Sequence, residues 1–494
     1  MKKLLTLVLF GFMFVSMLNA QTGIKGTIVN EYGEPLVGAT IHDKTSDKAV
    51  QTDFDGNFEL KVKSGEHQIE VIFVSYTTLD LTVNVTDGQM INIGQKIMES
   101  SAIGIDAIKV IADRAKERET PVAFSDVSKK DIDQQLGSRD IPLVMNVTPS
   151  VYATAQGGGA GDARINVRGF NQRNVAIMIN GVPVNDMENG WVYWSNWDGL
   201  ADATSSIQMQ RGMSAVNLAT PSVGGTMNII TSPAALDAGG AVKFEYGSGD
   251  FMKTTLSGNS GLINDKYAVS ASVVRKVGTG VIDATWTDAW AYYFGASYQI
   301  NKKNRLELFA MGAPQRHGQN LYRQNVAAYS TDYANEIGAD LAAANITEEG
   351  RGWNENWNTV STSYTGQQFW NGKTRDRFAT DFINERENYY HKPVVNLNWY
   401  SQWTQKVRQS TVLYYSGGNG GGSGTLGTVE WDYSTPSRRV DWDGTIAENS
   451  LTDTAFGILR NSVNEQWTLG ALSRVDIHFN DDFKMAAGID LRTA

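Results

Sequence analysis

Long segments in which apolar and polar residues alternate restrict the fold of this chain more than any other feature. In residues 290–300 the even positions carry the apolar side chains Trp290, Tyr292, Phe294, Ala296, Tyr298 and Ile300. Residues 467–479 follow the same two-residue period, which is typical of strands with one apolar face. Strands of about ten residues with aromatic rings near both ends are typical of a membrane-spanning β-barrel. We therefore expect barrel wall over residues 236–494.

Further alternating segments and the connections between them fit the same architecture. The segments are residues 266–276, 305–311, 394–402, 408–415 and 482–492. Residues 301–304 and 480–482 predict tight turns, whereas residues 313–389 and 417–466 are long, polar and rich in Trp and Gly. Outer-membrane barrels alternate short turns at one end with long loops at the other.

The N-terminus and the composition restrict location and chemistry. Lys2 and Lys3 precede an apolar run over residues 4–15, and Ala20 provides a small residue for signal peptidase, so residues 1–20 predict a signal peptide. The apolar run is shorter than the roughly twenty residues of a spanning helix. The 494 residues include no cysteine, which excludes disulfides, thiolate metal sites, cysteine nucleophiles and a lipoprotein anchor. The formal charge of −10 argues against a nucleic-acid partner.

Residues 21–100 predict a small β-sandwich, because about seven short strands alternate with turns. Asp53 and Asp55 lack the spacing of an EF-hand and predict a turn instead. His67 and Glu70 have the spacing of a zinc peptidase motif, but positions i and i+3 of a strand face opposite sides. The sequence contains no other metal-ligand spacing and no nucleophile or acid–base constellation. We therefore expect no enzyme activity, no metal and no cofactor.

Residues 164–231 carry the motifs with the most fixed spacings. They read RINVRGF, then NGVPVND, then IQMQRG followed by GGTMNIIT. These motifs resemble the plug domain of TonB-dependent outer-membrane receptors, and residues 121–235 are the expected plug. Met213 and residues 217–220 depart from the family pattern. The motif residues are Arg164, Arg168, Gly169, Asn180, Gly181, Arg211, Gly212, Gly224 and Gly225.

The N-terminal domain supports the same resemblance, since the order of its turns and strands resembles the carboxypeptidase-regulatory-like domain that precedes some plugs. The resemblance implies a mainly β protein: a small sandwich, an α/β plug and an antiparallel transmembrane barrel of the 22-stranded type. It implies binding of a ligand outside the cell and import to the periplasm with energy passed on by TonB. The alternating segments predict about nine strands after residue 235, so we expect the chain to be the N-terminal part of a longer receptor.

The resemblance also implies partners and a TonB-binding peptide. The partners are TonB with its inner-membrane energising complex, outer-membrane lipid and a small or oligomeric nutrient, and the resemblance allows for a surface lipoprotein. The expected TonB box lies in the linker over residues 101–120 and comprises Asp106, Ala107, Ile108, Lys109, Val110 and Ile111. An extended segment can bind by adding a strand to a partner sheet. The alternative for these residues is a first strand of the plug. Residues 128–137 predict a short helix with a capping box.

An aromatic cluster within the plug is the candidate ligand site. It comprises Trp191, Tyr193, Trp194 and Trp197. Aromatic rings can stack on a sugar or another flat ligand, and they can equally pack against the barrel wall. The ligand itself stays open among glycans, siderophores, cobalamin and peptides. The alternative function is that of a secreted or surface glycan-binding adhesin without transport.

Overall fold

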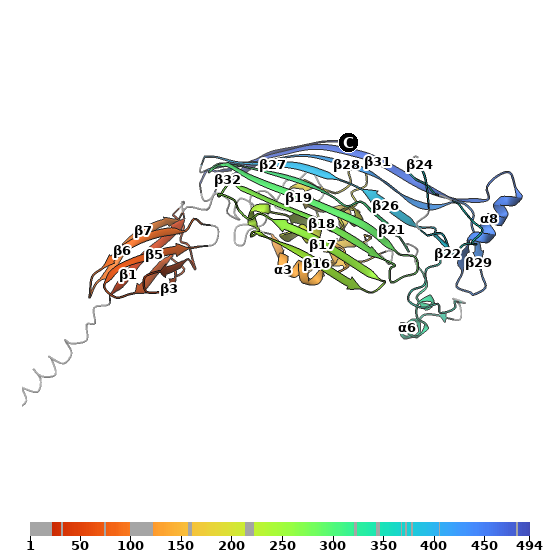
Figure 1. The fold of residues 1–494 in the computed structure, drawn as a ribbon, viewed down its shortest axis with the longest axis horizontal. Coiled ribbons are helices and arrows are strands. Elements are labelled where there is room, and N and C mark those ends of the chain that lie inside the picture. The colour runs from red at the N-terminus through yellow and green to blue at the C-terminus, as the bar shows by residue number, and fades with distance from the viewer. Residues whose placement is uncertain are drawn as a thin grey trace, which may run out of the picture. The chain divides into compact units, whose positions relative to one another are not determined.

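The computed structural model describes residues 22–30, 33–73, 76–98, 122–156, 161–212, 222–320, 324–341, 346–366, 368–370, 373–376, 379–404, 406–480 and 483–494. It divides into two compact units, residues 1–107 and 108–494. Figure 1 shows the elements of both units. Within the described part, no helix is long and apolar enough to cross a membrane.

The described residues of the first unit form seven strands in one mixed and one antiparallel sheet. One sheet has the order β4(Asn57–Lys61), β1(Gly23–Asn30), β7(Met90–Met98), and the other has the order β3(Lys48–Gln51), β2(Thr40–Asp43), β5(Gly65–Ile72), β6(Leu79–Val85). Apolar side chains from both sheets form one buried cluster that includes Ile24, Ile41, Phe58 and Val71. The unit therefore has its own hydrophobic core.

Two sequence predictions in this unit can be checked directly. Asp53 Oδ1 accepts hydrogen bonds from the backbone amides of Asp55 and Asn57 at 3.0 and 2.8 Å, as a turn requires. His67 is buried with Nδ1 2.7 Å from Asp43 Oδ2, whereas Glu70 points to the other face and pairs with Lys44 at 2.7 Å. The two side chains of the peptidase-like spacing thus lie on opposite faces.

The plug region is built from two small sheets and short helices. The larger sheet has the order β13(Val182–Pro183), β12(Val175–Ile179), β15(Gly225–Ile230), β14(Ser206–Arg211), β8(Ala123–Ser128), and the smaller has the order β11(Phe170–Asn171), β10(Arg164–Val167), β9(Val151–Thr154). Every residue of β12 and β15 is buried. The helical elements are α3(Lys129–Gln135), α4(Ile141–Val144), η2(Met145–Val147), η3(Gln172–Asn174), η4(Trp194–Trp197), α5(Leu200–Ala203) and η5(Pro233–Ala235). Ser128 and Asp131 form the predicted capping box of α3.

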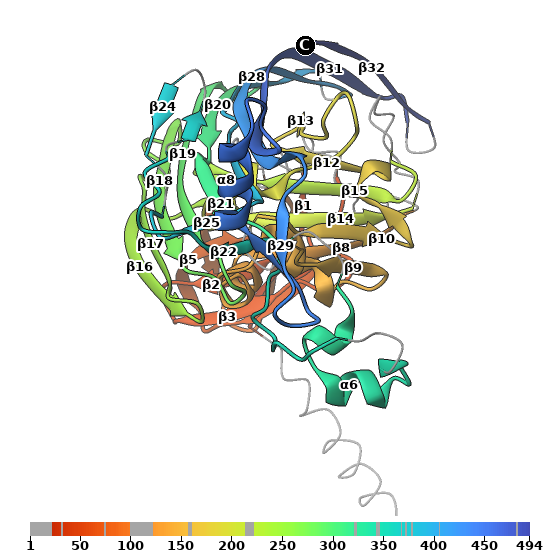
Figure 2. The same ribbon diagram turned by 90° about the vertical axis from the view of Figure 1, so that its right-hand side faces the viewer.

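One large antiparallel sheet of eleven strands, here called the wall, follows the plug. Its long strands are β16(Gly239–Gly247), β17(Phe251–Asn259), β18(Tyr267–Gly278), β19(Thr287–Asn301), β20(Asn304–Gly312), β27(Val394–Thr404), β28(Val407–Gly427), β31(Gly457–His478) and β32(Lys484–Thr493). The two short strands are β21(Gln315–Gly318) and β26(Glu387–His391). Figure 2 shows the plug strands on the concave side of this curved sheet.

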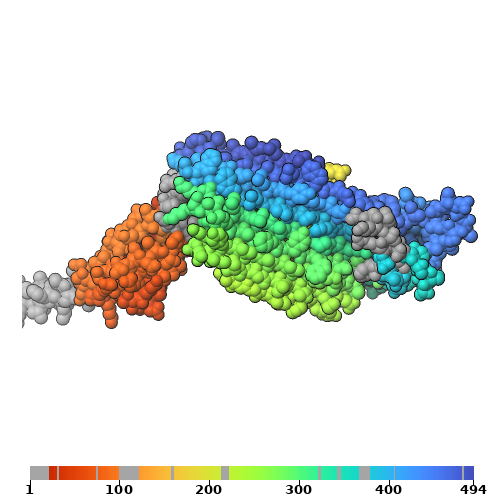
Figure 3. Space-filling view, turned by 45° about the horizontal axis from the view of Figure 1, so that its top comes forward, coloured from red at the N-terminus to blue at the C-terminus, as the bar shows by residue number. Residues whose placement is uncertain are grey.

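The wall exposes apolar side chains on its outer face, whereas its inner face carries polar side chains beside apolar ones that pack on the plug. Large apolar side chains of neighbouring strands are exposed, among them Phe244, Leu256, Val273, Phe294, Leu308, Leu397, Leu413 and Leu469. Polar side chains of the same strands are buried on the plug side, among them Lys253, Ser272, Ser297, Arg305, Glu307 and Asn398. Figure 3 shows the outer face continuing from green to dark blue. This polarity is the reverse of a water-soluble protein and is expected where the outer face meets lipid.

The two long loops predicted from the sequence are shorter than expected, because strands extend into them. Residues 417–427 continue β28 and residues 457–466 belong to β31, with the two strands paired from Val407↔Ile477 to Gly427↔Gly457. Residues 315–318 and 387–391 form β21 and β26, which also join the wall. The glycine-rich run over 417–424 lacks the side chains that would reveal alternation, but it can still pair through its backbone.

The remaining long connections leave the wall at one end, here called the loop end. The connection from β20 to β27 carries η6(Val326–Ala328), α6(Thr331–Glu336), β22(Trp357–Thr359), β23(Gln368–Trp370), β24(Lys373–Arg375) and β25(Phe382–Asn384). The connection from β28 to β31 carries β29(Glu430–Asp432), β30(Arg439–Asp441) and α8(Trp442–Leu451). Val360, Val429, Val440 and Trp442 form a buried cluster between the two connections.

Candidate functional site

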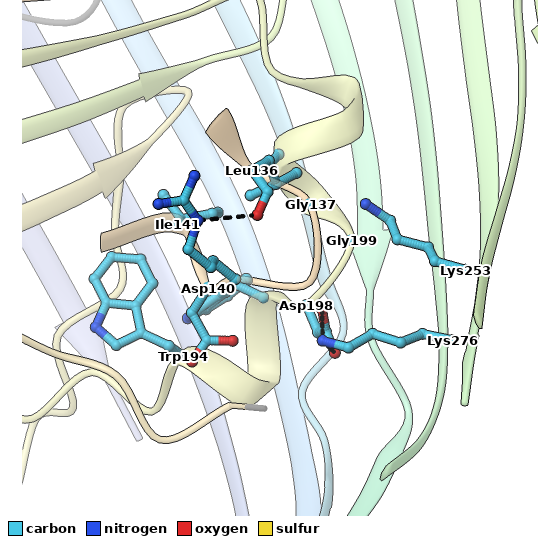
Figure 4. Close-up of a pocket in the computed structure, with 12 residues that line it drawn as sticks. Leu136, Gly137, Asp140, Ile141, Trp194, Asp198, Gly199, Lys253 and Lys276 are labelled. Carbon is cyan, nitrogen blue, oxygen red and sulfur yellow. Dashed lines mark hydrogen bonds and ion pairs between the residues drawn. The ribbon is translucent and has the colours of Figure 1, made fainter. Parts of the chain in front are cut away.

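The plug is held against the wall by buried ion pairs. Lys276 in β18 is 3% exposed, and its Nζ lies 3.0 and 2.8 Å from the two carboxylate oxygens of Asp198. Figure 4 shows the ammonium of Lys276 directed at Asp198. Every second side chain of a wall strand points toward the plug. A lysine at such a position contacts a plug carboxylate instead of solvent.

A second plug carboxylate, Asp202, pairs with two wall lysines. Its oxygens lie 2.7 Å from Lys253 Nζ and 3.1 Å from Lys243 Nζ. Glu245 lies 3.3 Å from Lys243 and 3.2 Å from Lys253, so the four side chains form a network. Burial alone would raise the pKa of Asp202, but the charge and hydrogen bond of Lys253 hold this pKa below its usual value.

Asp140 lies behind the Asp198–Lys276 pair and is fully enclosed. Its carboxylate accepts hydrogen bonds from the backbone amides of Gly161 and Ala163 at 2.9 and 3.1 Å. Burial raises the pKa of Asp140 to about 6, against the opposing charge of Lys276.

The cavity between these groups is too small for a nutrient. It is lined by plug residues including Asp140, Trp194 and Asp198 and by the wall lysines Lys253 and Lys276 (Figure 4). Its volume of ≈ 10 Å³ is about that of one water site. The charged groups around it therefore join plug to wall and do not form a ligand pocket.

Further polar contacts join the plug to the wall. Asp162 lies 3.1 Å from His317 Nε2 in β21 and accepts a hydrogen bond from Gln319 at 2.8 Å. Burial would raise the pKa of Asp162, yet the facing His317 lowers it. Asn398 in β27 donates a hydrogen bond to the backbone carbonyl of Asn180 at 2.9 Å.

Several plug motif residues lie where the backbone turns sharply or packs closely against another strand. Asn180 and Gly181 have φ of 50° and 85°, the left-handed pair of the predicted tight turn. Arg211 donates to the backbone carbonyls of Pro149 and Phe124 at 3.0 and 3.3 Å. A Cβ on Gly225 would stand 2.1 Å from the carbonyl oxygen of Gln210.

The other motif residues lie around the same strands. Arg168 and Gly169 are exposed and both have positive φ, at 51° and 82°. A Cβ on Gly212 would stand 2.5 Å from Arg168 Nη1, and one on Gly224 would stand 2.8 Å from Phe170 Cβ. Arg164 belongs to a different environment, beside Trp191.

The aromatic cluster divides into buried and accessible rings. Trp194 and Trp197 are 2% and 3% exposed and belong to the core shared by plug and wall. Tyr193 is 45% exposed, and Trp191 is half-buried beneath two arginines. Trp194 and Trp197 therefore pack in this core, as one of the two alternatives for the cluster predicts, and ligand binding by the cluster stays a prediction.

The predicted TonB box, residues 106–111, and the predicted signal peptide lie outside the described residues. The first described strand of the plug is β8, at an edge of its sheet and paired there with β14.

The sequence analysis missed the ionic contacts between plug and wall. Lys253 and Lys276 lie in strands whose residues alternate between the two faces of the sheet. The sequence alternation therefore indicates that both side chains point to the inner face. Their partners Asp198 and Asp202 lie far away along the chain, and no local spacing connects them.

Comparison with known proteins agrees with this architecture. Residues 116–226 match the TonB-dependent Receptor Plug Domain, and residues 24–110 match the CarboxypepD_reg-like domain. The TonB-dependent receptor P39 of Formosa agariphila is 25% identical over 230 residues, which cover 46% of this chain and 21% of that protein. The TonB-dependent receptor SusC of Bacteroides thetaiotaomicron is 25% identical over 191 residues, covering 37% of this chain and 18% of that protein.

The structure of the ferric-catecholate import receptor Fiu from E. coli K12 aligns with a TM-score of 0.47 at 15% identity, covering 76% of this chain and 47% of that one. The chain spans less than a third of the length of the curated relatives it matches.

The chain thus combines a match to a CarboxypepD_reg-like domain, a match to a plug domain and a large antiparallel sheet, in that order. These two domains and the curated relatives show that the chain is similar to TonB-dependent receptors.

Proposed function

We propose that the receptor binds a nutrient at the loop end of its wall and imports it to the periplasm with energy supplied by TonB. The observation that carries this proposal is the seating of the plug inside a sheet whose outer face is apolar. The buried pairs of Asp198 with Lys276 and of Asp202 with Lys253 hold that plug in place. Such a plug blocks a pore at rest and needs an energy source to open.

The wall is, in this proposal, part of a closed transmembrane barrel of the 22-stranded type. Barrels that hold a plug have about 22 strands, because fewer strands enclose too narrow a lumen. The outward rings and aliphatic side chains of β19, β28 and β31 would contact lipid. The polar inner face would surround the plug and the path of the ligand.

TonB would act on the plug through the segment before β8. The candidate box, residues 106–111, would add a strand to TonB. A pull on this segment would first act on β8. Among the described strands, this edge strand pairs only with β14, from Ala123↔Arg211 to Ser128↔Ser206. An edge strand loaded from its end can separate pair by pair, so this strand would detach before the buried strands β12 and β15.

Deletion of residues 106–111 tests the role of the box. The nutrient is first found by growth of a strain without the receptor on defined carbon and iron sources. We expect the deletion variant to keep surface binding of that nutrient and to lose its uptake. A matched variant replaces residues 113–118 by a flexible linker of equal length and should take up the nutrient normally. Normal uptake after deletion of 106–111 would contradict the box assignment, and binding without any import by the unchanged receptor would favour an adhesin.

A further inference from the structure

Two arginines share one tryptophan ring in the plug. The guanidinium carbon of Arg164 lies 5.1 Å from the centroid of the Trp191 ring, and that of Arg173 lies 4.6 Å from it. Arg164 belongs to β10 and Arg173 to η3, so the ring gathers charges from two elements. The electron-rich face of an indole attracts a guanidinium. We call Arg164 and Arg173 the arginine pair.

The turn that carries Trp191 is fixed by its own hydrogen bonds. Asp186 donates its backbone amide to the carbonyl of Trp191 at 2.8 Å, and Asn189 Oδ1 accepts from the amide of Trp191 at 2.8 Å. The carboxylate of Asp186 accepts from the backbone amides of Glu188 and Asn189 at 3.0 and 3.1 Å. The ring is therefore held in place, and this carboxylate is used within the turn.

The arginine pair lacks a neutralising carboxylate. Among the described residues, neither guanidinium has a carboxylate within ion-pair distance. Asp162 precedes Arg164 by two residues, and its carboxylate contacts His317 and Gln319. Arg164 Nη1 donates to the backbone carbonyls of Ala163 and Asp162 at 2.9 and 3.3 Å, which satisfies hydrogen bonds but not charge.

The arginine pair lies on an accessible part of the plug, because Arg173 is exposed and Arg164 is half-buried. Tyr193, two residues after Trp191, is exposed as well. The Tyr193 hydroxyl also accepts a hydrogen bond from Asn189 at 3.3 Å. A ligand in the surrounding solvent can therefore contact Arg173.

We propose that the arginine pair is an anion-binding site and that the imported ligand carries a carboxylate or a similar oxyanion. A guanidinium binds a planar oxyanion through two parallel hydrogen bonds. With guanidinium groups over its ring, Trp191 is a positioning residue for the arginines and is poorly placed to stack on a neutral sugar. Acidic oligosaccharides and anionic metal chelates share this chemistry. The statement that the ligand is imported rests on the proposed function. The statement that an oxyanion binds to the arginine pair does not.

Binding is measured on cells that lack TonB, so that transport does not enter the result. The probes are trigalacturonate as an acidic sugar, maltotriose as a neutral sugar of equal length, and ferric dicitrate as an anionic chelate. We expect at least one anionic probe to bind, with an affinity that falls as salt is added, and maltotriose not to bind. The two anionic probes distinguish the two sources of the oxyanion.

Variants then connect binding to the arginine pair. Arg173→Gln and Arg164→Gln should each weaken binding of the anionic probe about tenfold, as expected for the loss of a charged hydrogen bond. Trp191→Ala should also weaken it, and Trp191→Phe should recover part of the loss because a ring remains. Lys130→Gln in α3 removes the same charge from an exposed site on the plug and should have no effect.

Three outcomes would overturn the inference: maltotriose binds as tightly as the anionic probes, neither anionic probe binds, or the two Arg→Gln variants bind normally. Failure of the proposed function looks different, since the receptor would then bind the anionic probe in these cells and not import it when TonB is present.

Discussion

Replacing Lys276 by methionine should loosen the plug and make the outer membrane leaky. The ammonium of Lys276 is the hydrogen-bond partner of Asp198, and it lowers the pKa of the enclosed Asp140. Without it, two carboxylates face each other across a water-sized cavity. Breaking a buried ion pair by removing one partner costs about 3–5 kcal/mol, and the solvent that reaches Asp198 places this case at the lower end. The measurement is entry of a large antibiotic that the outer membrane normally excludes.

A neighbouring arginine provides the matched control for this experiment. Arg275 precedes Lys276 in β18, but it pairs with Asp288 and lies over Trp290, away from the plug. Arg275→Met removes a charge from the same strand and should leave the membrane tight. The double variant Lys276→Met with Asp198→Asn also removes the unpaired carboxylate charge of Asp198. Entry of the antibiotic should therefore be lower than in Lys276→Met alone. A tight membrane in cells with normal amounts of Lys276→Met receptor would show that this pair does not hold the plug.

Replacing Phe294 by lysine should strongly destabilise the receptor in the membrane. Phe294 lies near the middle of β19 with its ring on the outer face of the wall. A lysine on the lipid face costs about 2–4 kcal/mol at the midplane of the bilayer and about 0–1 kcal/mol near its edges. The free energy of unfolding is measured by denaturant titration of receptor refolded into lipid vesicles.

The control for this variant is Ile300→Lys, at the end of the same strand and on the same face. Its lysine can extend to the membrane surface, so its effect should be small. Equal effects at positions 294 and 300 would contradict a lipid-facing wall, because a surface in water would treat the two lysines alike.

The sequence predicted the strands of the wall well, since alternation marks one face of a strand directly. The segment predicted over 290–300 is observed as β19 over residues 287–301. The sequence failed where alternation is invisible, as in the glycine run of β28, whose strand character depends on pairing with β31. Strand content there is set by a distant partner and not by local pattern.

The candidate site was harder to predict than the fold. Four aromatic residues within seven positions have equivalent chemistry, but the fold buries Trp194 and Trp197 and leaves Tyr193 exposed. Whether a ring packs or binds depends on which way the turn faces the wall. The arginine pair around Trp191 was missed because Arg164, Arg173 and Trp191 are spaced without a local period and meet only in the folded plug.

Binding and uptake of the identified nutrient, measured side by side in cells with and without TonB, test the central claim most directly. We expect surface binding to be the same in both strains and accumulation in the periplasm to occur only where TonB is present. Equal accumulation in the two strains would contradict the account, because the plug would then open without the pull that the proposal requires.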